Sequence, residues 1–126
     1  MEQLMRKYKQ ATALAPYKAA YGVYRKDMAS VRKALPNIRF SDYRAYYETI
    51  LLSEDGESGQ ARERLESIKK PWMRSALLAE IELKAGHREA AIEHAKEALN
   101  SSRGVHRYVL YKEYERLLPQ AVESLA

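Results

Sequence analysis

Apolar residues return every three or four positions along most of this 126-residue chain, and that spacing constrains the fold more than any other feature. In an α-helix, positions three and four apart share a face, whereas the side chains of a strand alternate between two faces. No run of β-branched residues alternates with polar residues as a half-buried strand would. The sequence therefore predicts an all-α fold of packed amphipathic helices.

Turn and helix-ending residues divide the chain into about seven helices. The expected breaks are at Pro16, Pro36-Asn37, Glu54-Asp55-Gly56, Lys70-Pro71, Gly86-His87 and residues 100–104. Pro16 and Pro71 suit the first turn of a helix, because a proline has no N–H and that N–H would be unpaired there. Gly86 suits a helix end that needs a positive φ. Pro119 predicts a kink or a break in the last helix.

The segment after Pro16 carries a regular apolar stripe. Its members are Tyr17, Tyr21, Tyr24, Met28, Val31 and Leu35. This spacing predicts one amphipathic helix over about 16–35 that is buried along the stripe, after a shorter helix through Leu4, Tyr8 and Ala11. We expect one domain over 1–126, with basic, tyrosine-rich helices over 1–35, two helical hairpins over 41–100 and a closing helix over 105–126.

The composition disfavours several classes of protein. The chain has no cysteine, which removes a disulfide framework and a thiolate zinc site and suits a reducing compartment. No apolar stretch approaches the roughly 20 residues of a membrane-spanning helix. The N-terminus runs directly into charged residues, unlike a secretory signal peptide. We expect a soluble cytoplasmic protein without a membrane partner.

The polar residues form no recognisable catalytic or metal-binding pattern. No two of the three histidines, His87, His94 and His106, are three or four positions apart, the spacing that would make a metal-binding pair on a helix. Glu80 and Glu82 lie two apart on a helix, so they point to different faces and do not suit an acid–base pair. With five glycines, the chain has no phosphate-binding glycine loop. We expect neither an enzyme, nor a cofactor, nor a metal site.

One unit of the chain resembles the tetratricopeptide repeat, in which two antiparallel helices pack around small residues. Within it, Leu78 and Ala79 match the family's Leu-Gly pair, and Gly86 matches the glycine between the helices. Ala91 and Ala98 match the two alanines of the second helix. The matching unit covers about residues 72–99.

A more degenerate unit precedes it, because Gly56, Ala61 and Ile68 stand thirty residues before Gly86, Ala91 and Ala98. The resemblance implies a right-handed stack of antiparallel helical hairpins that acts as a protein-binding scaffold. A helical bundle of another kind is the alternative fold.

The resemblance also implies a groove on the first helix of each hairpin. The corresponding positions combine apolar and charged residues: Tyr43, Tyr46, Ile50, Met73, Ala76, Glu80 and Lys84. Such a groove takes a peptide or helix of another protein by apolar anchors. The first functional hypothesis is therefore a non-catalytic adaptor that binds a partner protein at these residues. Glu80 stands where the family's carboxylate clamp has Asn, which disfavours a C-terminal carboxylate as the ligand.

The distribution of charge supports a second hypothesis, association with nucleic acid. Residues 1–44 hold ten Lys and Arg against three acids, whereas the remainder is close to neutral. Five of these cations stand beside the tyrosine stripe: Lys18, Arg25, Lys26, Arg32 and Lys33. Lys18, Arg25 and Arg32 are seven apart and form one ridge if the helix is continuous. Cations beside aromatic rings can hold phosphates and stack on the bases of RNA, although a solvated basic face is the simpler interpretation.

Self-association is the third hypothesis. The stripes from Tyr17 to Leu35 and from Tyr111 to Leu125 keep the three-and-four spacing of helix-pairing seams, so either could join two copies into a homodimer. The chain has ten tyrosines against one Phe and one Trp. Such rings either seal half-buried helix interfaces or provide an exposed contact surface.

Overall fold

All regular structure in the computed structural model is helical over the residues it describes, which are 2–123 and 125, with side chains from residue 13 onward. The helices are α1 (Glu2–Tyr24), α2 (Met28–Ala34), the 3-10 turn η1 (Leu35–Asn37), α3 (Ser41–Glu54), α4 (Ser58–Leu65), α5 (Pro71–Lys84), α6 (Arg88–Ser101), α7 (Gly104–Leu117) and α8 (Pro119–Glu123). The all-α class is confirmed. No helix in the described part is both long enough and apolar enough to cross a membrane.

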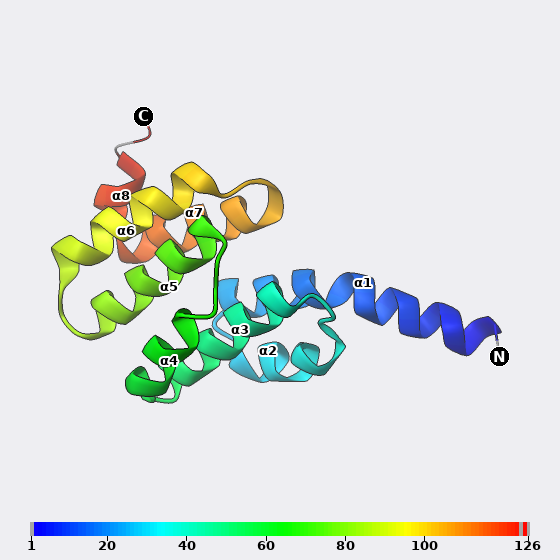
Figure 1. Ribbon diagram of the computed structural model, residues 1–126. Helices are drawn as coiled ribbons and strands as arrows, with labels where there is room; N and C mark the ends of the chain where they lie inside the picture. The colour runs from blue at the N-terminus through cyan, green and yellow to red at the C-terminus, as the bar shows by residue number, and fades with distance from the viewer. Residues whose placement is uncertain (1, 124, 126) are drawn as a thin grey trace.

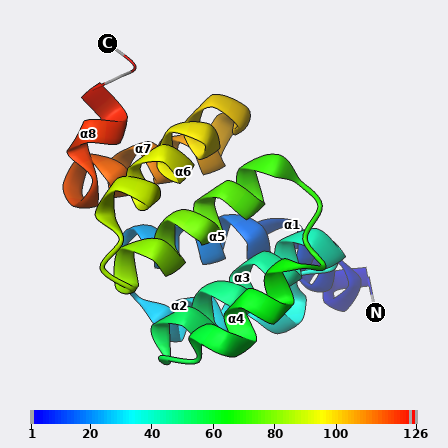
Figure 2. The same ribbon diagram turned by 60° about the vertical axis from the view of Figure 1, so that its left-hand side comes forward.

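Consecutive helices pack as antiparallel hairpins (Figures 1 and 2), with α5 and α6 forming the most extensive interface. Small side chains permit the close approach of these two helices, since Ala79, Ala91, Ala95 and Ala98 are all completely or almost completely buried. Pro71 begins α5, and Gly86 turns the chain at φ 86°, as the sequence predicts.

Three hairpin turns recur at thirty-residue intervals, since Lys26, Gly56 and Gly86 adopt positive φ values of 58°, 81° and 86°. In each turn the next amide donates to the carbonyl five residues earlier, at 2.7, 2.9 and 2.8 Å. This is the Schellman ending of a helix. Buried positions follow the same interval: Val31, Ala61 and Ala91, then Ile38, Ile68 and Ala98. The fold is therefore compatible with a helical repeat of three hairpins followed by α7 and α8.

The N-terminal region differs from the prediction. Helix α1 passes through Pro16 without a break and ends at Tyr24. The predicted break at Pro16 and the predicted single helix over about 16–35 are therefore both wrong. The chain turns instead at Lys26, and the Asp27 carboxylate caps α2 by accepting a hydrogen bond from the Ser30 amide at 3.2 Å. The sequence conceals this turn because a lysine occupies the left-handed position that glycine fills in the two later turns.

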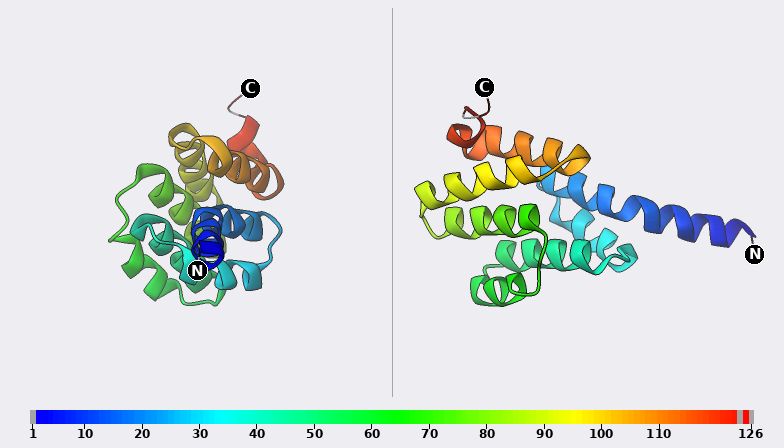
Figure 3. Two further views of the ribbon diagram at one scale, coloured as in Figure 1. Left: turned by 90° about the vertical axis from the view of Figure 1, so that its right-hand side faces the viewer. Right: turned by 45° about the horizontal axis from the view of Figure 1, so that its top comes forward.

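The buried face of α1 also differs from the predicted stripe. Tyr17 and Tyr21 are 47% and 52% exposed, and small residues face the core instead, namely Ala15, Ala19, Ala20 and Val23. The N-terminal part of α1 extends away from the other helices (Figure 3).

Neither apolar stripe forms the continuous helix that a pairing seam needs. The first stripe is split by the turn at Lys26. The second is split between Leu117 and Pro119, where α7 ends and α8 begins, as the proline predicts. Tyr114, Leu118 and Ala121 of the second stripe are buried within the protein itself. The expected continuous seams are therefore wrong, while self-association itself stays a prediction.

Candidate binding pocket

Helices α1, α3, α5 and α7, the first members of their hairpins, surround a pocket of about 240 Å³. The pocket forms because α1 packs against α7, which brings the beginning and the end of the chain together over α3 and α5. Sites for drug-sized molecules usually measure about 300–1,000 Å³. This pocket is smaller, and its size suits one amino-acid side chain.

Apolar residues form most of the wall. They come from both ends of the chain and from its middle: Val23, Met28, Ile50, Leu83, Leu110 and Leu117. Tyr46 and Tyr114 also line the pocket and are 5% and 6% exposed. The pocket can therefore surround a hydrocarbon chain and offer it the faces or edges of two aromatic rings.

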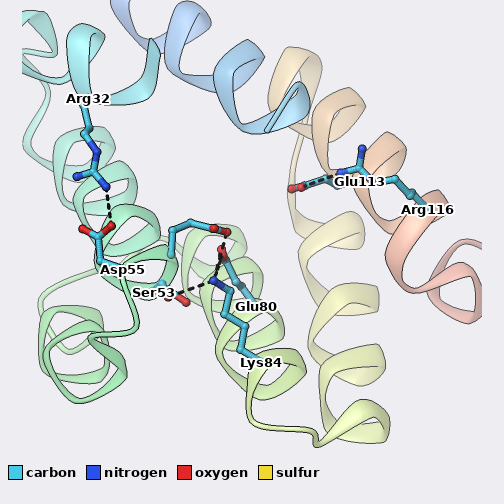
Figure 4. Close-up of polar contacts among 8 residues, drawn as sticks. Arg32, Ser53, Asp55, Glu80, Lys84, Glu113 and Arg116 are labelled. Atoms are coloured by element: carbon cyan, nitrogen blue, oxygen red, sulfur yellow. Dashed lines mark hydrogen bonds and ion pairs between the residues drawn. The ribbon is translucent and has the colours of Figure 1, made fainter. Parts of the chain in front are cut away.

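Three carboxyl groups stand at the pocket, Glu54 on α3, Glu80 on α5 and Glu113 on α7. Glu80 and Glu54 are hydrogen-bonded to one another. Lys84 contacts both, with Nζ 3.3 Å from Glu54 Oε1 and 3.9 Å from Glu80 Oε1. Figure 4 shows Glu80 and Lys84 on α5, with Glu113 on the opposite side beside Arg116. The ion pair between Arg116 and Glu113 Oε1 spans 3.4 Å.

Burial changes the protonation of two of these acids. It raises the pKa of Glu80 to about 8, and the neighbouring carboxyls of Glu113 and Glu54 add to the effect. Burial also raises the pKa of Glu113 to about 7, against the opposing charges of Arg116 and Lys26. Near neutral pH, Glu80 is therefore mostly protonated and can donate its hydrogen bond to Glu54.

The hydroxyl of Tyr114 is buried and has no hydrogen-bond partner among the described residues. Burial raises the pKa of this phenol, and the charges of Glu113 and Glu80, which line the same pocket, raise it further. Leaving a buried hydroxyl unpaired costs about 1–3 kcal/mol. One residue of the pocket wall thus carries an unused hydrogen-bonding group.

Most of the predicted partner-binding residues meet at this pocket. Tyr46, Ile50, Ala76, Glu80 and Lys84 all line it. Two others do not, because Met73 is completely buried in the core and Tyr43 packs elsewhere, against the ring of His106 at 5.1 Å. Helices α1 and α7 narrow the expected groove to a pocket.

The sequence analysis missed Glu113 and Tyr114, which complete the pocket from α7. Only the closure of α1 against α7 brings them to Glu80, and no local pattern encodes that contact. The thirty-residue interval offers a signal, because it aligns Leu110 with Ile50 and Glu80.

The predicted basic ridge is not continuous. Lys18, Arg25 and Lys33 line a hollow between α1 and α2, whereas Lys26 lines the pocket. Arg32 points elsewhere and pairs with Asp55 at 2.6 Å (Figure 4). The ridge is divided because the turn at Lys26 reverses the chain between Arg25 and Arg32. All five cations remain exposed.

His106 belongs to a separate cluster that joins α7 to α3. Its Nε2 lies 3.0 Å from the Tyr47 hydroxyl, which also donates to the Pro16 carbonyl at 3.3 Å. The imidazole lies against Tyr43 and Trp72, with ring centroids 5.1 and 4.9 Å away. Burial, together with the charge of Lys70, lowers the pKa of His106 to about 4. This neutral histidine ties the helices together.

Among residues 2–123 and 125, no three His, Asp or Glu side chains are grouped as a metal site would require. Comparison with known proteins found no matching family model, no similar curated protein and no similar solved structure.

Proposed function

We propose that the protein is a non-catalytic, cytoplasmic interaction module that binds a segment of a partner protein, with one side chain of that segment inserted in the pocket. The observation that carries this proposal is the convergence of four first helices on a pocket sized for one side chain. Interface energy usually concentrates in a few anchors that fill such pockets, while the surrounding contacts exclude water.

The recurring hairpins also favour an interaction module. Stacked helical hairpins place the same face of each first helix on one side, and repeat proteins bind partners along that side. We place the chain near the tetratricopeptide repeats on this ground. Its turns at Lys26, Gly56 and Gly86 recur every thirty residues, a shorter interval than the roughly 34 of that family.

A pocket-filling variant tests the proposal. Leu83 and Leu78 are both half-buried on α5, but only Leu83 lines the pocket. The immobilised wild-type chain, Leu83→Trp and Leu78→Trp are compared as baits in a nuclease-treated cytosolic extract, after circular dichroism and thermal unfolding have shown that each is folded. We expect one discrete protein to resist moderate salt on the wild type and on Leu78→Trp, and to be lost from Leu83→Trp. Equal recovery on all three baits would exclude the pocket as the binding site.

Nucleic-acid binding is a second candidate, favoured by the hollow between α1 and α2. Three exposed cations, Lys18, Arg25 and Lys33, line it together with Tyr21, whose ring is 52% exposed. This combination can hold phosphates and stack on a base. Among its lining residues the hollow also contains Asp27, which opposes a phosphate.

The triple variant Lys18→Glu/Arg25→Glu/Lys33→Glu tests the second candidate against single-stranded RNA and DNA. Lys69→Glu/Lys96→Glu/Lys112→Glu changes the net charge equally at other sites and serves as the control. If the hollow binds nucleic acid, only the first variant abolishes binding, and wild-type affinity falls steeply between about 50 and 200 mM salt. Equal losses in both variants would indicate attraction by overall charge.

A further inference from the structure

We propose that the pocket recognises a cationic side chain of the partner segment, the ammonium of a lysine or the guanidinium of an arginine. This inference rests on the proposed function and names the chemistry of the inserted side chain. The geometry that carries it is the meeting of three carboxyl groups with Tyr114, whose hydroxyl has no partner among the described residues, at a mainly apolar pocket whose wall also includes Lys26 and Lys84.

The carboxyl groups come from three different helices and face the same space. Glu54, Glu80 and Glu113 are brought together only by the closure of the hairpins. Glu80 and Glu113 are buried more deeply, with side chains 25% and 18% exposed, than Glu54 at 38%. Buried carboxylates are found with cationic or hydrogen-bonding partners, because an unpaired charge in a protein interior is costly.

The cations that belong to the protein lie toward the outside of this group. Lys84 and Arg116 have side chains 41% and 46% exposed, and Lys26 is exposed as well. Lys84 Nζ also donates a hydrogen bond to the Ser53 carbonyl at 3.1 Å, in addition to its ion pairs with Glu54 and Glu80. The two lysines of the pocket wall are thus more exposed than the carboxyl groups of Glu80 and Glu113.

Protonation supports the same conclusion. Burial and neighbouring carboxyls raise the pKa of Glu80, so a proton there takes the role that a positive charge would otherwise have. Glu54 and Lys84 contact Glu80, Glu113 on α7 lines the same pocket, and the charges of Lys26 and Arg116 act on Glu113. A cation that enters replaces the proton on Glu80, and the released proton goes to solvent.

Tyr114 provides an independent observation. Its hydroxyl is buried without a partner among the described residues, and Tyr114 lines the same pocket as Glu80 and Glu113, so the oxygen is available to accept a hydrogen bond from an ammonium or a guanidinium. The rings of Tyr46 and Tyr114 add attraction for a cation near their faces. The apolar wall, including Ile50 and Leu117, covers the methylene stem of a lysine or arginine.

Amide chemical shifts of the ¹⁵N-labelled chain test the inference with four probes. These are the N-acetyl amides of lysine, arginine and norleucine, and free putrescine. Norleucine has the length and shape of lysine without its charge. We expect saturable shifts at Leu83 and Tyr114 with the lysine and arginine probes, and at least about tenfold weaker binding of norleucine, as for loss of a charge-assisted hydrogen bond.

Variants complete the test. Glu80→Gln/Glu113→Gln removes the two buried acids, whereas Glu115→Gln changes an acid on α7 that pairs with Lys112 outside the pocket. We expect only the double variant to lose the preference for lysine over norleucine. Tyr114→Phe should weaken binding of the lysine and arginine probes and leave binding of the norleucine probe unchanged.

The outcomes separate this inference from the proposed function. Equal binding of the norleucine and lysine probes, or no saturable shift with any probe, overturns the inference that the pocket recognises a cation. The Leu83→Trp capture experiment then still decides whether the pocket binds a partner. Tighter binding of putrescine than of the lysine probe overturns a partner side chain as the source and assigns the site to a free amine. Loss of the lysine preference in Glu115→Gln also contradicts the inference.

Discussion

Replacing Glu80 with glutamine is expected to change how the stability of the protein depends on pH. The folded-state pKa of this acid is about 8, above its ordinary value of 4.5, so between these values the folded chain holds a proton that the unfolded chain releases. Stability from this group is complete below the ordinary value and is lost as the pH rises through about 8. The free energy of unfolding should fall by about 1.4 kcal/mol per pH unit well below pH 8, and by about 1.6 kcal/mol in total from pH 6.5 to 8, through Glu80 alone.

Urea unfolding at a series of pH values across this interval measures the effect. Glutamine is neutral at every pH, so Glu80→Gln should remove the slope that Glu80 contributes and keep only the part due to Glu113 below about pH 7. Glu115→Gln serves as the control, because its carboxyl lies outside the pocket, and should retain the wild-type slope. A flat wild-type curve, or an unchanged slope in Glu80→Gln, would refute the assignment of a buried, protonated acid.

Two further predictions concern hydroxyls and the first turn. Thermal unfolding should show that Tyr47→Phe destabilises the fold by about 1–2 kcal/mol, because its hydroxyl bonds His106, whereas Tyr114→Phe is neutral or stabilising since that hydroxyl is unpaired. Equal losses in both variants would contradict these hydrogen-bond assignments. Lys26→Gly should raise the free energy of unfolding by about 1 kcal/mol, because glycine removes the steric cost of a lysine in the left-handed conformation; urea denaturation measures this change. A destabilised Lys26→Gly variant would disprove the positive φ.

The sequence predicts the middle of this fold well for a local reason. Helices α5 and α6 have a proline at the start, a glycine at the turn and small residues at the interface, and each signal acts within a few neighbouring positions. The turn at Lys26 is not predicted from the sequence, because a lysine stands at the positive-φ position where the two later turns have a glycine. Asp27 followed by Ser30 is the remaining local sign, a side-chain cap that begins α2.

The candidate site is predictable only in part. The hairpin resemblance indicates Glu80 and Lys84 because they lie on the groove face of the first helix of one repeat unit. Glu113 and Tyr114 join them through the packing of α1 against α7, a contact between opposite ends of the chain. The pocket and the burial that alters its carboxyl groups arise from this tertiary closure.

The carboxyl ¹³C signal of Glu80, followed from pH 5 to 9 with and without the N-acetyl amide of lysine, tests the central claim most directly. The account predicts a midpoint near 8 in the free protein. With saturating ligand it predicts a midpoint at least about one unit lower, since a cation bound about tenfold more tightly to the carboxylate than to the acid lowers the pKa by that amount. A free midpoint near the ordinary value of 4.5, or the same midpoint with and without ligand, would contradict the claim that a cationic side chain replaces the proton in this pocket.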